Sequence, residues 1–199
     1  DFSNQIGESF FFGADFMAVE ETSLSVDQST TDQTSSQETQ STFDIRNGNI
    51  YLEARLAPER LSLYFDENIT PSGANSREAF VLIKGLPSSS YLKVGRMLLP
   101  YGIRLWDDDA FIRQVTGFNF DNQDMGIEVG LAPGNTSFSL ALSNGTQGSR
   151  DDNTDKAISS VGSVYLNNLI LGGSFSLNES RGIDRMLFGS FASLRLGQL

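Results

Sequence analysis

The stretch Met125-Gly126-Ile127-Glu128-Val129-Gly130-Leu131 decides the fold class, because its apolar residues alternate strictly with small or polar ones. The apolar residues fall on one face of an extended chain and the others fall on the opposite face, which is the period of a β-strand. Residues 137–143 repeat this pattern, and the short segment 132–135 between the two runs carries a Pro and a Gly. The two runs are therefore predicted to form a β-hairpin.

The same period recurs along the chain and predicts about ten strands. They cover residues 8–20, 43–55, 60–67, 77–86, 90–99, 124–132, 136–144, 157–166, 168–178 and 184–197. No stretch approaches the roughly 20 apolar residues that a helical membrane span requires. The sequence therefore predicts an all-β fold.

Composition excludes several functions. The 199 residues include 14 Lys plus Arg and 25 Asp plus Glu, a net charge of −11, which argues against nucleic acid because phosphate binding needs a basic surface. The absence of Cys and His excludes thiol nucleophiles, disulfides, Cys/His zinc sites, haem attachment and imidazole chemistry in this chain. The acid pairs show no arrangement typical of glycoside hydrolysis. We therefore expect neither an enzyme nor a bound cofactor or metal.

The connections between the predicted strands differ at the two ends of the sheet. Long polar connections follow the odd strands, at residues 23–42, 68–76, 100–123, 145–155 and 179–183, while short turns follow the even strands. Long loops at one end and short turns at the other are typical of a bacterial outer-membrane β-barrel whose N-terminus is periplasmic. The sequence thus predicts an antiparallel up-and-down transmembrane β-barrel in the outer membrane of a Gram-negative bacterium.

The chain shows no linker between two cores, so residues 1–199 are predicted to form a single β-barrel unit. An open sheet edge is costly in lipid, and a transmembrane sheet must therefore close. Because residues 194–199 read as part of a strand, we expect this unit to be the N-terminal part of a longer barrel of about 16 strands. A closed barrel of about ten strands is the alternative.

The stretch LKVGRMLLPYGIRL, residues 92–105, is the most specific in the chain. It resembles a segment of porin-like outer-membrane proteins, including the phosphate-selective porin group, where a strand ends and a loop folds toward the lumen. Residues 116–119 and 124–128 resemble the return into the next strand of those proteins. The resemblance covers residues 91–145 and implies a barrel with an inward loop.

Loop 100–123 is the candidate pore constriction. Pro100 ends the strand by removing a hydrogen-bond donor, and Gly102 permits a sharp bend, so the chain can leave the wall and turn inward. Charged side chains in such a loop select solutes by sign and size. The candidate constriction residues are Arg104, Asp107, Asp108, Asp109 and Arg113. The alternative is an extracellular loop whose charges are merely solvated.

A second group of candidates lies on the predicted wall. Basic residues there would attract anions if they faced the lumen; they are Arg46, Arg55, Lys84, Lys93 and Arg96. Lys93 and Arg96 fall on opposite faces of an ideal strand, so both face the lumen only if a bulge, expected at Gly95, shifts the register. The alternative is ordinary lumen polarity balanced by acidic partners, namely Glu53, Glu78 and Glu128.

Three functions are open at this point. The first is a porin-like channel for passive diffusion of small hydrophilic or ionic solutes. The second is a sheath or scaffold that encloses a partner protein, such as a multihaem cytochrome, which would bring every cofactor itself. The third is a soluble or surface-exposed β-sandwich for binding or adhesion, against which the loop asymmetry argues. The partners expected for a barrel are outer-membrane lipid, small solutes, and either further copies of the chain or an enclosed protein.

Overall fold

The computed structural model describes residues 2–6, 9–28, 35–57, 59–70, 73–104, 111–120, 122–146, 151, 154–180 and 183–195. These residues form one 11-stranded sheet in which each strand pairs with its neighbours in chain order, and every pairing is antiparallel. The predicted all-β, antiparallel, up-and-down arrangement is therefore confirmed. None of the described helices has the length and apolar character needed to span a bilayer.

The strands follow each other along the chain with few interruptions. They are β1 (Phe2–Ile6), β2 (Phe10–Gln28), β3 (Ser35–Ala57), β4 (Leu61–Thr70), β5 (Gly73–Leu86), β6 (Ser90–Met97), β7 (Asp124–Leu131), β8 (Thr136–Ser143), β9 (Ala157–Leu166), β10 (Leu169–Ser180) and β11 (Ile183–Leu194). The described helical segments are the 3-10 turn η1 (Pro87–Ser89) and the short helix α1 (Phe111–Thr116).

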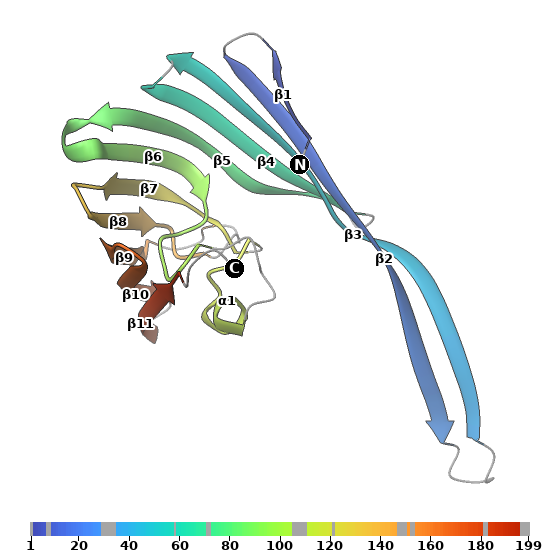
Figure 1. Ribbon diagram of the computed structural model, residues 1–199. Helices are drawn as coiled ribbons and strands as arrows, with labels where there is room; N and C mark the ends of the chain where they lie inside the picture. The colour runs from blue at the N-terminus through green and yellow to red at the C-terminus, as the bar shows by residue number, and fades with distance from the viewer. Residues whose placement is uncertain are drawn as a thin grey trace.

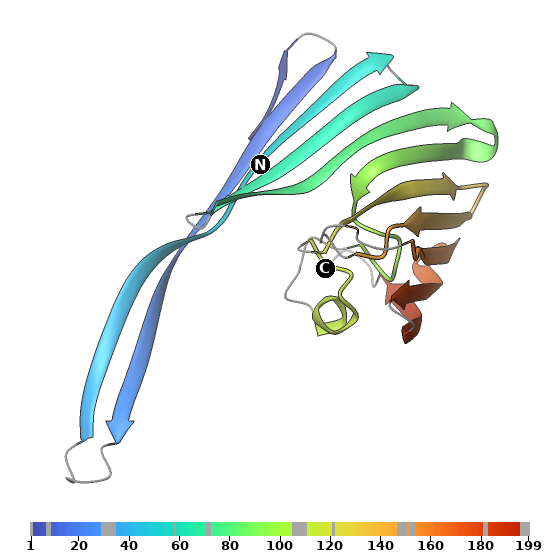
Figure 2. The same cartoon turned by 180° about the vertical axis from the view of Figure 1, so that it is seen from behind.

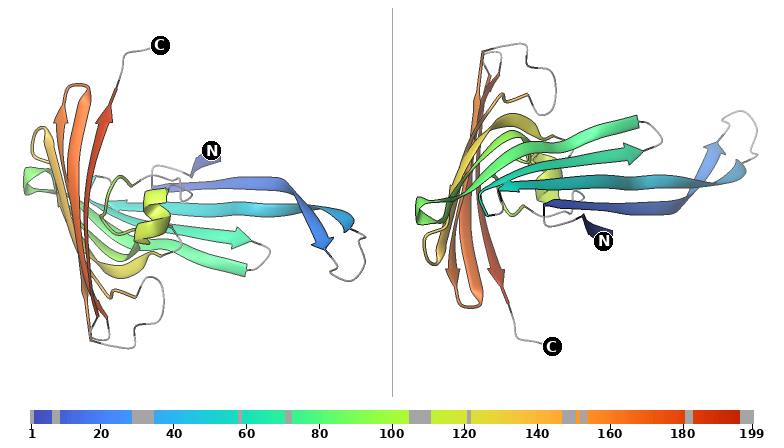
Figure 3. Two further views of the ribbon diagram at one scale, coloured as in Figure 1. Left: turned by 90° about the horizontal axis from the view of Figure 1, so that it is seen from below. Right: turned by 90° about the horizontal axis from the view of Figure 1, so that it is seen from above.

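The sheet is strongly curved and open (Figures 1 and 2). Its two edges are β1 and β11, and in the part of the chain that the structure describes these strands do not pair with each other. The predicted closure into a barrel is thus not present within this sheet. Helix α1 lies on the concave side, inside the bend of the sheet (Figure 3).

All ten predicted strands are present, and β1 was missed. Three segments expected to be loops prove to be continuations of hairpins, since the β2–β3 pairing runs out to Gln28 and Ser35, the β4–β5 pairing to Thr70 and Gly73, and the β10–β11 pairing to Ser180 and Ile183. Backbone hydrogen bonds hold these ladders together whatever the polarity of the side chains. The β2–β3 hairpin consequently projects far beyond the rest of the sheet (Figure 1).

The two ends of the sheet nevertheless differ as expected. The turns at one end are short, at residues 87–89, 132–135 and 167–168. The opposite end carries the long connections 98–123 and 144–156, together with the tips of the three extended hairpins. The predicted difference in connection length between the two ends is therefore present. Part of the long end consists of protruding strands instead of loops.

The two faces of the sheet have opposite polarity, and the polar face is the buried one. Along β7 and β8, Ile127 pairs with Leu142 and Val129 with Leu140 on the convex face, and all four side chains are exposed. The buried residues on the concave face are largely polar, and they include Ser62, Asp66, Glu128, Ser143, Ser159, Ser174 and Ser176. This distribution is the reverse of that in a water-soluble protein, where the buried face of a sheet is apolar.

Gly95 marks the tightest backbone approach in the centre of the sheet. Its φ is +138°, and a Cβ at this position would lie 2.3 Å from the carbonyl oxygen of Ala79 and 2.7 Å from the Cα of Phe80. The substitution Gly95→Ala is therefore expected to destabilise the fold by about 2 kcal/mol, measured as a lower midpoint of urea unfolding. Gly173→Ala is the matched control, because the nearest atom to its Cβ would be at 3.6 Å. Equal midpoints for the two variants would contradict this account of Gly95.

Candidate functional site

The chain that leaves β6 folds back over the concave face instead of leaving the sheet. We call residues 98–104, 111–120 and 122–123 the inward segment. The backbone N–H of Leu98 donates a hydrogen bond to Glu78 Oε1 on β5 over 2.9 Å, and the N–H of Gly102 donates to Ser174 Oγ on β10 over 2.8 Å. The inward segment therefore bridges β5 and β10, and its contact with β10 joins residues that are 72 positions apart in the chain.

Arg104 links the inward segment to the sheet through an ion pair with Glu128. Its Nη2 donates to Glu128 Oε2 over 2.7 Å, and the Glu128 side chain is fully buried. The hydroxyl of Tyr91 donates to the other Glu128 oxygen, and Lys93 lies opposite Glu128 in the β6–β7 register. One buried carboxylate is thus surrounded by a guanidinium, an ammonium and a phenol.

Helix α1 is held against β11, the last strand of the sheet. Nη2 of Arg185 on β11 donates to the carbonyl oxygens of Val115 and Thr116, over 3.4 and 3.1 Å, at the C-terminal end of the helix. A cation placed there neutralises the carbonyl groups that lack a partner within the helix. Arg113 of the same helix is buried, with Nη1 3.5 Å from the carbonyl oxygen of Ile103.

Aromatic rings of the inward segment stack on each other and against arginine side chains. The rings of Tyr101 and Phe118 stack with their centroids 4.5 Å apart, and the guanidinium groups of Arg77 and Arg113 lie 4.6 and 5.5 Å from the ring of Phe120. Burial raises the pKa of the Tyr101 hydroxyl, and the nearby charge of Arg185 opposes part of that rise. These contacts anchor the segment with apolar surface as well as with hydrogen bonds.

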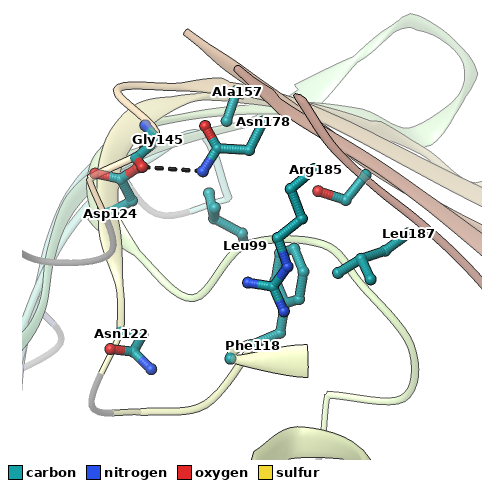
Figure 4. Close-up of a pocket in the computed structure, with 11 residues that line it drawn as sticks. Leu99, Phe118, Asn122, Asp124, Gly145, Ala157, Asn178, Arg185 and Leu187 are labelled. Atoms are coloured by element: carbon teal, nitrogen blue, oxygen red, sulfur yellow. Dashed lines mark hydrogen bonds between the residues drawn. The ribbon is translucent and has the colours of Figure 1, made fainter. Parts of the chain in front are cut away.

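Asp124 fixes the chain where it re-enters the wall at β7. Its carboxylate accepts hydrogen bonds from the backbone N–H groups of Met125, Gly145 and Thr146 and from the Thr146 hydroxyl. Figure 4 shows Asp124 at the rim of a pocket, with Arg185 reaching from the other side toward Phe118. The start of the long connection between β8 and β9 is thereby tied to the end of the inward segment.

The structure describes two of the five residues predicted to form a pore constriction. Arg104 and Arg113 both lie on the concave face within the inward segment, as expected from the bend at Pro100 and Gly102. Asp107, Asp108 and Asp109 fall outside the described residues. The chain after Pro100 therefore does fold over the concave face, and a constriction formed by any of these residues stays a prediction.

Three of the predicted wall residues, Arg55, Lys84 and Lys93, lie on the concave face. Arg55 pairs with Glu53 over 2.9 Å and lines a hollow with Lys84 near the short-turn end of the concave face. Lys93 also faces inward, because it pairs with Glu128 in the register and lies 4.4 Å from the Phe80 ring.

The position of Arg96 differs from the one predicted for it on the wall. The pairings of β6 run without a shift from Leu92 to Arg96, so Arg96 lies opposite Ala79 and Met125 on the other face from Lys93. The bulge expected at Gly95 is therefore absent, and the expectation that Arg96 shares a face of the sheet with Lys93 was wrong. Gly95 relieves a close backbone approach here and does not change the register.

Sequence reasoning missed several residues that hold the site together. They are Ser174 and Arg185, each contributed by a strand to a contact with the inward segment. Glu78, expected only as an acidic partner of the wall bases, accepts the hydrogen bond from Leu98. A bulge in the β4–β5 pairing, between Asp66 and Glu67, also leaves the buried Arg77 as the extra residue, and its Nη1 donates to Asn49 Oδ1 over 3.0 Å. No pattern in the sequence marks these contacts, since each depends on distant strands.

The chemistry available at the site is that of charge and hydrogen bonding along a narrowed concave surface. Among the residues that the structure describes, no three carboxylates gather in an arrangement that could hold a metal ion. Arg55, Arg104 and Lys93 each have a carboxylate nearby, so the charges of the inner wall are balanced locally. No protein family, no curated protein and no solved structure matches this chain.

Proposed function

We propose that the chain forms the wall and the constriction of a porin-like channel in the outer membrane of a Gram-negative bacterium, through which small hydrophilic or ionic solutes diffuse passively. The proposal follows from the polarity of the two faces and from the course of the inward segment. It assigns the convex face to lipid, the concave face to a wet lumen, and Arg104 and Arg113 to the constriction.

The observation that carries the proposal is the apolar convex face. Exposed large apolar side chains follow one another across neighbouring strands, including Phe12, Leu52, Phe65, Ile127, Leu140, Leu142, Ile158, Leu171 and Phe188. A contiguous apolar surface of this kind is rare on soluble monomers and marks contact with a membrane or a partner. All the described strands belong to one sheet, so no second sheet covers this face as it would in a β-sandwich.

The concave face supplies the features expected of a lumen. It is lined by serines and paired charges, which suits contact with water and with polar solutes. The inward segment crosses this face, in the way that a loop narrows a pore. Because the segment lies over the face that an enclosed protein would have to contact, the channel is favoured over a sheath around a partner.

The two open edges set a requirement on the channel. The unpaired N–H and C=O groups of an edge strand cannot be left in hydrocarbon, where each costs several kcal/mol. A membrane barrel built on this sheet therefore needs strands that pair with β1 and with β11.

Single-channel recording in a planar bilayer tests the proposal directly. Stable open steps are expected from the folded protein, and a salt gradient gives the ion preference as a reversal potential. Protein that inserts and conducts nothing, at any voltage up to bilayer rupture, would refute a diffusion channel and favour a filled lumen.

Arg104 is expected to contribute to ion selection at the constriction. Removing its positive charge with Arg104→Ala should shift the reversal potential toward cation preference, because the carboxylate of Glu128 then loses its partner in the pore. Arg60→Ala is the control, since Arg60 is exposed in the short turn between β3 and β4. A reversal potential that is identical in both variants and the parent protein would remove Arg104 from the constriction.

A further inference from the structure

Asp66, on the concave face of β4, is a buried carboxylate whose two oxygens accept no hydrogen bond. The residue is 1% exposed, and neither Oδ1 nor Oδ2 has a partner within hydrogen-bond distance. Removing an isolated charge from water is costly, so buried carboxylates are normally held by hydrogen bonds, by a positive group or by a metal ion. Asp66 lacks the first of these three.

The nearest phenol groups are directed away from Asp66. Tyr51 lies opposite Asp66 in the β3–β4 register, but its ring extends over β2, where a Cβ on Gly13 would lie 2.3 Å from the Tyr51 hydroxyl. Tyr64, two residues before Asp66 on the same face, stacks its ring on that of Phe80 with the centroids 5.0 Å apart. The two tyrosines therefore do not supply the missing donor.

A second carboxylate lies directly opposite Asp66. Glu78 of β5 is its partner in the register, and like charges in such a pair are destabilising. Opposite residues of an antiparallel pair have their Cβ atoms about 4.5 to 5.5 Å apart, so one ion can contact both carboxylates. The hydrogen bond from Leu98 goes to Oε1 of Glu78 and does not occupy Oε2.

The charges around Asp66 are mainly negative. Three acidic side chains and one basic side chain act on it electrostatically, namely Glu78, Asp15, Glu67 and Arg77. The guanidinium of Arg77 donates to Asn49 Oδ1 over 3.0 Å, and no hydrogen bond joins it to Asp66. One positive charge is thus set against four negative ones, and an added cation would reduce their repulsion.

Calcium fits this pair of carboxylates better than magnesium does. Ca²⁺ accepts bidentate carboxylates in irregular geometry, whereas Mg²⁺ keeps several of its water molecules. The burial of Asp66 leaves little access for such a water shell. Two acidic ligands with a guanidinium nearby predict weak binding, with a dissociation constant of about 0.1 to 1 mM, as in extracellular calcium modules.

We propose that Asp66 and Glu78 bind a calcium ion between β4 and β5, through both oxygens of Asp66 and Oε2 of Glu78. The ion lies beside the hydrogen bond from Leu98 to Glu78, so it strengthens the attachment of the inward segment to the sheet. This inference goes beyond the proposed channel and does not depend on it, because the site can be tested by protein stability alone.

The test is urea unfolding of the full chain, folded in detergent, with CaCl₂ or with EDTA at equal ionic strength. About 10 mM calcium should raise the unfolding midpoint of the parent by about 0.5 M or more, and magnesium should raise it by less. Asp66→Asn should abolish the calcium response and raise the midpoint in EDTA, because it removes a buried charge that lacks a partner.

Glu67→Gln is the matched control and should keep the calcium response. Glu67 is the next residue of β4 and pairs with Ile50, whose side chain is exposed on the convex face. Glu78→Gln provides a second variant, which keeps an acceptor for Leu98 and should also lose the response.

The inference is overturned if calcium does not shift the midpoint of the parent, if Asp66→Asn responds like the parent, or if Glu67→Gln loses the response as well. A parent midpoint that rises on acidification and not with calcium would show that Asp66 binds a proton instead, and would also overturn it. A calcium response in protein that does not conduct would support the site and refute the channel. Conductance without a calcium response would do the opposite.

Discussion

Glu128→Gln is expected to lower the free energy of unfolding by about 3 kcal/mol. The parent carboxylate is fully buried, accepts hydrogen bonds from Arg104 and Tyr91, and lies opposite Lys93 in the register. Glutamine has nearly the same volume and can still accept from Tyr91, so packing changes little. What changes is charge, since a guanidinium and an ammonium then share a poorly solvated site with no anion between them.

The measurement is the midpoint of urea unfolding of the folded protein, with Glu59→Gln as the matched control. Glu59 is exposed in the turn between β3 and β4, so the same chemical change there should have little effect. Equal midpoints for the two variants would show that Glu128 is hydrated in the folded protein and that its contacts are not structural.

A double-mutant cycle separates the Arg104–Glu128 pair from other effects of Glu128. If the cost of Glu128→Gln comes largely from a stranded guanidinium, Arg104→Gln should recover part of it, and the double variant should be more stable than the sum of the single changes predicts. Strict additivity would instead place the effect on Lys93 and Tyr91. Release of the inward segment should also make Glu128→Gln more sensitive to proteolysis within residues 98–123.

The strands were predictable from sequence wherever one face of the sheet is apolar. In β7, the residues Ile127, Val129 and Leu131 alternate with Gly and Glu, and this alternation predicts both the strand and the face that points outward. Beyond the apolar part of the sheet, the polarity of the side chains does not distinguish a strand from a loop. The outer part of the β2–β3 hairpin is rich in Ser, Thr and Gln, and its pairing rests on backbone hydrogen bonds that any of these residues can make.

The candidate site was predictable in its local part only. Pro100 and Gly102 indicated that the chain turns inward, and Arg104 is indeed on the concave face. The residues that receive the segment, Ser174 and Arg185, lie more than 60 residues further along the chain. Their role depends on the register of β10 and β11 beneath the segment, which no local pattern contains.

Helix α1 and the orientation of Arg96 were missed for a different reason. A helix of 6 residues is too short to display an amphipathic period, and α1 is held by Arg185 at its C-terminal end rather than by its own propensity. Arg96 was placed in the lumen by way of an irregularity at Gly95. The irregularity exists as a positive φ of 138°, but the residue pairing continues through it unchanged.

Leu140→Arg gives the sharpest separation between a lipid-facing and a water-facing convex surface. Leu140 is 44% exposed, pairs with Val129, and has Phe138 and Leu142 on the same face of β8. In lipid vesicles the arginine should lower the free energy of unfolding by about 2 to 4 kcal/mol, since a charge near the centre of the apolar band must leave water. On a surface exposed to water the same substitution would change it by no more than about 0.5 kcal/mol.

Ala132→Arg is the matched control, because Ala132 is exposed in the turn that joins β7 to β8 and lies outside the apolar band. The two variants add the same charge within one hairpin, so a difference between them reports on the surroundings of Leu140 alone. A large cost for Leu140→Arg that is confined to vesicles would support lipid as the neighbour of the convex face. Equal stability of the two variants in vesicles would mean that water or a polar partner covers this face, and the proposed membrane channel would then be wrong whatever the shape of the concave side.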